Sequence, residues 1–110
     1  MAYDVEVADR LREELAGEPG VSEKPMFGGL AFLINGNLAV SASGQGGLLL
    51  RVDPSQTDKL VAEPQARPFV MRGRELAGWL HIAATVLDSD SDFSRWVALG
   101  VARARSLPPK

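Results

Sequence analysis

The sequence contains no cysteine and only one histidine, His81. The lack of cysteine excludes disulfides, thiolate nucleophiles, zinc fingers and iron–sulfur clusters, and a single histidine excludes multi-histidine metal sites. No apolar run approaches the ~20 residues that a membrane-spanning helix needs. Residues 1–4 lack the basic and apolar regions of a signal peptide. We therefore expect a cytoplasmic protein that does not associate with a membrane.

What the sequence does contain is typical of one globular domain. It has 110 residues, of which 45% are hydrophobic and 24% charged. A chain of this length can bury enough surface to fold without crosslinks. We expect a single domain over residues 1–110.

Charge is spread unevenly around the net value of −2. Residues 1–24 hold seven acids against three bases, whereas residues 93–110 hold four bases and no acid. We expect solvated helix faces of opposite sign at the two ends, and the alternative is a small anion- or phosphate-binding patch made by the C-terminal arginines. A second basic group consists of Arg67, Arg72 and Arg74. The overall acidity argues against a dedicated duplex-DNA binder, which usually presents a broad basic face.

Apolar spacing predicts a helix at each end of the chain. The first runs from about Val5 to Ala16, with Asp4 as its N-cap. The last opens at Ser89 and carries apolar and small residues at helical spacing: Phe93, Trp96, Val97, Gly100 and Ala104. Glycine inside a helix costs about 1 kcal/mol relative to alanine. We therefore expect the last helix to lie close against another element at Gly100.

Between these helices the pattern changes to strands. Residues 30–34 form a short apolar run, and Asn35-Gly36 after it is a strong hairpin signal. Further strands are expected over 37–43 and 48–52, completing a three-stranded meander. In the middle strand, alternation predicts that Leu38, Val40 and Ala42 face the core, and that Ala39, Ser41 and Ser43 face away.

The second half of the chain adds one helix and two strands. Asp53-Pro54 is typical of a helix start, here over about 55–62. Strands are expected over 67–71 and 77–82, joined across Gly73. The order α-β-β-β-α-β-β-α predicts a two-layer α+β fold, with an antiparallel five-stranded sheet and helices on one face. The other face would be solvated or bound to something, and it offers a surface for homodimerisation.

No motif in the sequence is complete enough to predict a phosphate-binding, calcium-binding or catalytic site. The glycine-rich residues 44–47 lack the Lys and Ser/Thr of a phosphate-binding loop. Residues 88–92 begin like a calcium loop, but Phe93 and Leu99 stand where Gly and Glu are needed. His81 lies beside Trp79 in an apolar strand, with no nucleophile or carboxylate at a suitable spacing. We expect no catalytic residue, no cofactor and no metal, and therefore no enzyme.

The segment from Lys24 to Val40, KPMFGGLAFLINGNLAV, resembles the N-terminal domain of the TfoX/Sxy family. Its Met-Phe-Gly-Gly opening is the most specific part of the likeness. The resemblance continues through Leu48–Val52, Arg67-Pro68-Phe69, Gly78-Trp79 and the closing residues 104–110.

The resemblance implies a fold similar to type III secretion chaperones, in the element order given above. Two-domain members of the family regulate DNA-uptake genes together with a cyclic-AMP receptor-type activator, and carry a second, helical domain. This chain is similar to the stand-alone, single-domain members.

The sequence and the resemblance together leave three hypotheses for the function. The first is a non-enzymatic interaction or regulatory module, a transcription-related regulator or adaptor that binds another protein and forms a homodimer. Its candidate interaction residues are Met26, Phe27, Gly28, Gly29, Arg51, Arg72 and Arg74. The second is direct nucleic-acid binding through the arginines, with an affinity that falls steeply with salt.

The third hypothesis is a small-ligand binder or enzyme with a pocket near Phe27-Gly28-Gly29, His81 and Trp79. The Phe-Gly-Gly segment itself has two interpretations, a binding site or a structural bulge, and we favour the bulge because bulges often need glycine.

Overall fold

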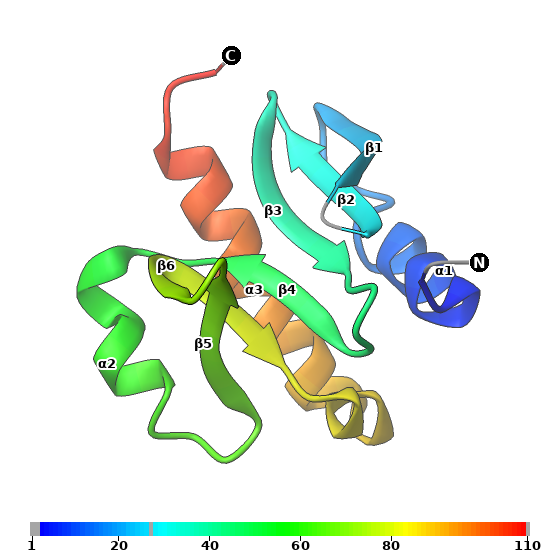
Figure 1. Cartoon of the computed structure of the whole chain (residues 1–110). Coiled ribbons are helices and arrows are strands. Elements are labelled where there is room, and N and C mark those ends of the chain that lie inside the picture. The colour runs from blue at the N-terminus through cyan, green and yellow to red at the C-terminus, as the bar shows by residue number, and fades with distance from the viewer. Residues whose placement is uncertain (1–2, 27, 110) are drawn as a thin grey trace.

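The computed structural model describes residues 3–26 and 28–109. Six strands form one sheet, with three α-helices around it (Figure 1). The elements in chain order are α1 (Val5–Glu14), β1 (Val21–Met26), β2 (Gly29–Ile34), β3 (Asn37–Ala42), β4 (Leu48–Arg51), α2 (Thr57–Leu60), β5 (Ala66–Met71), β6 (Arg74–Ile82) and α3 (Asp90–Ser106). Short 3-10 turns over Pro54–Gln56 and Ala84–Asp88 precede α2 and α3.

All strand pairs are antiparallel, in the order β1-β2-β3-β4-β6-β5. The α+β class is confirmed, but the expected number of five strands is wrong. The sixth strand is β1, which pairs with β2 along its whole length. It was missed because residues 22–25 are exposed and polar or proline, so no apolar alternation marks them.

The helix boundaries follow from their caps. The Asp4 carboxylate accepts a hydrogen bond from the Glu6 amide at 2.9 Å, and the Ser89 hydroxyl accepts one from the Asp92 amide at 3.3 Å. The apolar stripe predicted for α3 is confirmed as its buried face. In α1, Val7, Ala8 and Leu11 are buried, whereas Val5 is 41% exposed.

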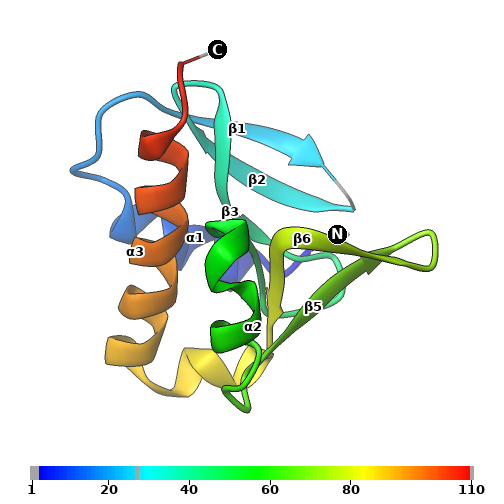
Figure 2. The same ribbon diagram turned by 90° about the vertical axis from the view of Figure 1, so that its left-hand side faces the viewer.

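Gly100 allows α3 to touch the sheet, as expected. A Cβ atom built there would clash with the Ala39 carbonyl oxygen on β3. The helix backbone and the strand backbone therefore meet directly. Figure 2 shows α3 on one side of the sheet, while the β1–β2 and β5–β6 hairpins extend toward the other side.

A bulge in β3 corrects the predicted alternation of that strand. Phe32 pairs with Val40 but Leu33 pairs with Leu38, so Ala39 is an extra residue. As a result Ala39, expected outside, belongs to the main core, and Leu38 leaves it. No helix among the described residues is long and apolar enough to cross a membrane.

Candidate interaction surface

The side of the sheet turned away from α3 is called the open face here. Pairing partners define one row of residues across it, because the residues on either side of this row in β2, β4 and β6 belong to the core on the other side. In strand order this row is Lys24, Ala31, Ser41, Leu49, His81 and Arg67.

The sequence predicted that this face is either solvated or bound to something, and the structure shows that the middle of the row is buried within the chain. Ala31, Ser41 and Leu49 are no more than 2% exposed, and the Ser41 hydroxyl donates to the Leu30 carbonyl at 3.0 Å. The two ends of the row, Lys24 and Arg67, are exposed. The open face thus has a buried middle, and an exposed basic residue lies at each edge of the sheet.

Arg51 and Trp79 are paired partners on β4 and β6. The Arg51 guanidinium carbon lies 5.6 Å from the centre of the Trp79 ring, within the range of a cation–π contact. The ring of Phe69, which is buried, lies 6.3 Å from that of Trp79 at a tilt of 34°. These aromatic rings pack against protein, so they do not form a free stacking platform for bases.

Arginines on the helix side of the molecule carry ion pairs. The closest contacts are 2.9 Å for Arg10–Asp90, 2.8 Å for Arg12–Glu23, 2.6 Å for Arg95–Glu63 and 3.0 Å for Arg105–Glu18. Hydrogen bonds from Arg12 lower the pKa of Glu23, and Glu63 raises the pKa of Arg95.

Arginines on the second half of the sheet lack such partners. In the described part of the chain, no ion pair is formed by Arg51, Arg67, Arg72 or Arg74. On the helix side, Arg103 is the one described arginine that also forms no ion pair. The predicted basic group at residues 67–74 is therefore a patch of uncompensated positive charge around β5 and β6.

The tip of the β5–β6 hairpin concentrates this charge. Arg72 and Gly73 have φ angles of 54° and 77°, as a two-residue hairpin turn requires. Arg72 and Arg74 are exposed there. Over residues 66–82 the sequence has three arginines and one acid, Glu75, for a net charge of +2.

The other candidate interaction residues lie at the β1–β2 hairpin. Met26 pairs with Gly29, Gly28 has a φ angle of 76°, and a Cβ atom on Gly29 would clash with the Ala42 carbonyl of β3. Phe27 lies outside the described residues. The described candidates thus do not form one site: the first group lies on the β1–β2 hairpin, Arg51 lies on β4 beyond β3, and Arg72 and Arg74 lie on the β5–β6 hairpin beyond β4.

His81 is held by the loop between β3 and β4. Its Nε2 lies 2.7 Å from the Gly46 carbonyl oxygen, which can only accept, so Nε2 carries the proton. Burial lowers the pKa of His81, against the opposing effect of this hydrogen bond, and the charge of Arg67 lowers it further. Its Nδ1 is buried and has no partner among the described residues.

A hollow of about 320 Å³ adjoins His81 and is lined also by Gln45, Gln65 and Arg67. Gly28, Gly29 and Trp79 are not among its lining residues. Gly29 and His81 lie on β2 and β6, with two strands between them. The pocket that the third hypothesis requires is therefore not assembled from these residues.

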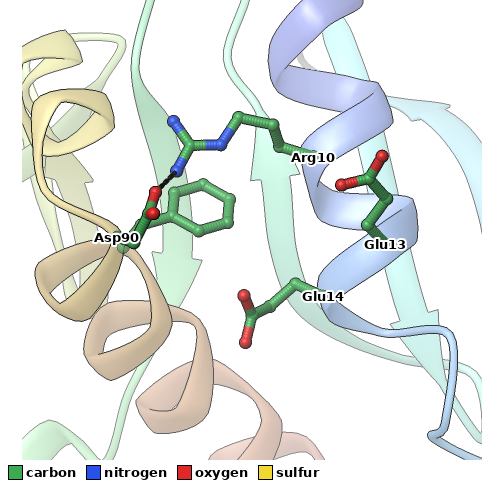
Figure 3. A pocket seen from close by; sticks show the side chains of 5 residues that line it. Arg10, Glu13, Glu14 and Asp90 are labelled. Carbon is green, nitrogen blue, oxygen red and sulfur yellow. Dashed lines mark hydrogen bonds and ion pairs between the residues drawn. The ribbon is translucent and has the colours of Figure 1, made fainter.

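A larger hollow of about 420 Å³ lies between α1 and α3 (Figure 3). Arg10 crosses it, donating to the Leu87 carbonyl at 2.8 Å and stacking 4.4 Å above the Phe93 ring. Glu14 reaches toward α3 and accepts from the Ser94 hydroxyl at 3.0 Å. These contacts join the two helices. The residues that make them are about 80 positions apart, and no local sequence signal predicts that they meet.

Among the described residues, no group of three or more histidine, aspartate and glutamate side chains is placed to hold a metal ion. The model of the TfoX N-terminal domain family matches residues 13–104, which include all six strands and most of α3. The chain belongs to the TfoX N-terminal domain family. Neither the curated proteins nor the solved structures contain a significant match. Membership places the TfoX N-terminal domain described here among regulatory and interaction modules.

Proposed function

We propose that this TfoX N-terminal domain is a non-enzymatic interaction module that binds another protein through the basic hairpin of β5 and β6. The observation that carries the proposal is the difference between two sets of arginines. Those on the helix side, except Arg103, are ion-paired, whereas Arg67, Arg72 and Arg74 form no ion pair in the described part of the chain. Unpaired basic groups on one surface favour a partner of complementary charge.

The environment of His81 supports a role without catalysis. The Nε2 proton is donated to Gly46, and the other ring nitrogen is shielded from solvent. A general base must reach the proton that it removes, either directly or through one water. A histidine that is buried among packed side chains and fastened to a loop serves packing better than proton transfer.

In the cell we expect a cytoplasmic regulator or adaptor, which fits the family's regulatory character. Homodimerisation stays part of this proposal, and sedimentation equilibrium over a hundredfold range of concentration tests it. Nucleic acid is the alternative partner, which the packed aromatic rings and the net negative charge of the chain disfavour.

The test compares three forms of the protein as baits for crosslinking in living cells followed by affinity purification. The first is unchanged, and the second carries Arg72→Glu and Arg74→Glu. The third, a control, carries Gln56→Glu, Lys59→Glu and Ala98→Glu, which make the same total change in charge at exposed helical positions.

We expect the same crosslinked protein from the unchanged and control forms, and its loss from the hairpin variant. Equal recovery by all three forms would contradict the proposal. Binding of fluorescently labelled DNA with a steep salt dependence, lost in the hairpin variant, would favour the nucleic-acid alternative instead.

A further inference from the structure

The sheet has two edge strands, β1 and β5, and they differ in charge. On β1, Glu23 is bound by two hydrogen bonds from Arg12, and Lys24 and Pro25 follow it. On β5 and its turn, the exposed charges are all basic: Arg67 and Arg72, with Arg74 directly after the turn. An edge strand presents unpaired backbone groups to any chain that can lie beside it.

The β5 edge also exposes an apolar residue. Val70 is 53% exposed, and the other large hydrophobic residue with high exposure among the described residues is Val5 on α1. Met71 and Arg74 flank a two-residue turn, so they form the hydrogen-bonded pair that closes the hairpin. Alternation then makes Val70 and Glu75 a non-hydrogen-bonded pair, which directs the Val70 N–H and C=O outward.

From this placement we infer that β5 accepts an extended acidic peptide segment of a partner protein as an additional strand along its outer edge. The inference rests on the proposed function and specifies the partner's chemistry. Backbone hydrogen bonds at Val70 supply affinity for an extended chain, and side-chain contacts supply its selectivity. Acidic side chains of the added strand pair with Arg67, Arg72 and Arg74.

A second copy of this chain fits the same edge less well. Pairing β5 with itself would bring the arginines of both copies together on one short edge, and like charges that face each other across strands are destabilising. Pro68 has no amide hydrogen to donate, which limits an added strand of either kind equally, so charge is what distinguishes the two. The β5 edge thus disfavours pairing with the β5 edge of a second copy, whereas it favours a segment of opposite charge.

The experiment uses two fluorescein-labelled octapeptides as probes, one alternating valine with glutamate and one alternating valine with lysine. Binding is measured by anisotropy at 50 and 200 mM salt, and the exchange of the Val70 amide hydrogen is followed by NMR. The protein variants are Arg72→Glu with Arg74→Glu, Val70→Pro, and Lys24→Glu on the opposite edge as a control. Circular dichroism confirms that each variant is folded.

We expect the unchanged protein to bind the glutamate peptide and to protect the Val70 amide when it does. The double arginine variant should bind the glutamate peptide at least about tenfold more weakly and should prefer the lysine peptide, since the charge complementarity is reversed. Val70→Pro should weaken binding, because it removes the outward amide hydrogen that the added strand would bond. Lys24→Glu should leave binding within about twofold.

Absence of glutamate-peptide binding, or equal binding of both peptides, overturns the inference and leaves the arginines as edge protection alone. Protection of the Val70 amide in the protein without peptide, increasing with protein concentration, also overturns it, because a second copy then occupies the edge. If the peptides fail while the crosslinked partner still depends on Arg72 and Arg74, only this inference falls. If that dependence is absent too, the proposed function falls with it.

Discussion

The helix side and the strand side of this domain use the same residue types for different purposes. On the helix side, Arg10 is stacked on Phe93 and bonded to Asp90 and the Leu87 carbonyl, and so joins α1 to the segment before α3. On the strand side, Arg72 and Arg74 are exposed at a hairpin tip and have no described ionic partner. Charged side chains therefore stabilise the fold on the helix side, whereas on the strand side they stay exposed and free to bind a partner.

The two faces of β4 give the largest test of this comparison. Leu50 is fully buried in the main core, whereas Leu49 is buried on the open face, outside that core. Leu50→Ala should cost about 3–4 kcal/mol of the free energy of unfolding, because it leaves a cavity that the surroundings cannot fill.

Leu49→Ala should cost less, roughly 2 kcal/mol, because Leu49 lies outside the main core. Urea denaturation of both variants measures the difference. Equal losses would contradict the distinction between the two faces.

The contact between α3 and β3 gives the next largest effect. Gly100→Ala should destabilise the fold by about 2 kcal/mol, because the new methyl group meets the Ala39 carbonyl and overpacks a backbone contact. Gly17→Ala is the matched control, since nothing lies within 4 Å of a Cβ atom there. Thermal unfolding should show a lower midpoint for the first variant only, and an unchanged midpoint for Gly100→Ala would disprove the close approach.

The arginines themselves give a smaller effect. Arg10→Ala should cost roughly 1 kcal/mol, because it removes the stacking on Phe93 together with a partly buried hydrogen bond. Arg74→Ala should change the free energy of unfolding by less than about 0.5 kcal/mol, as is usual for surface residues without packed partners. Chemical denaturation of the two variants in parallel tests whether only the helix-side arginine stabilises the fold.

His81 gives the smallest effect, visible as a dependence on pH. Because its pKa is lowered in the folded state, the unfolded chain binds a proton first as the pH falls below about 6.5. The free energy of unfolding should therefore be highest above that pH and should fall between pH 6.5 and the lower pKa of the folded state.

In His81→Gln this part of the pH dependence should disappear, although the acidic groups still titrate at lower pH. Urea denaturation at pH 7.5, 6.5 and 5.5 makes the comparison. The same slope in both proteins would show that His81 does not titrate differently on folding.

Local signals were sufficient for much of the fold. Asp4 and Ser89 cap their helices because a side-chain oxygen can bond the first free amides, which is a property of a few neighbouring residues. The Asn35-Gly36 turn has φ angles of 52° and 85°, as the dipeptide predicted. The buried stripe of α3 could be read in full from its spacing.

The strand β1 and the bulge at Ala39 could not be read in this way. An exposed edge strand buries no apolar row, so β1 exists because β2 offers it backbone partners, and no sequence period records that. The extra residue in β3 exchanges the faces of Leu38 and Ala39, and it depends on how α3 lies against the sheet.

The candidate surface divides along the same line. The helix caps, the tight turns and the presence of a basic group at Arg67, Arg72 and Arg74 follow from the sequence alone, because they depend on residues close together in the chain. Which arginines form ion pairs depends on the packing of distant segments. Glu18 and Arg105 meet across 87 positions, and Glu63 and Arg95 across 32, whereas Glu75 on β6 forms no ion pair with Arg67, Arg72 or Arg74 in the described part of the chain. Pairing over such distances follows from packing, which local spacing does not encode.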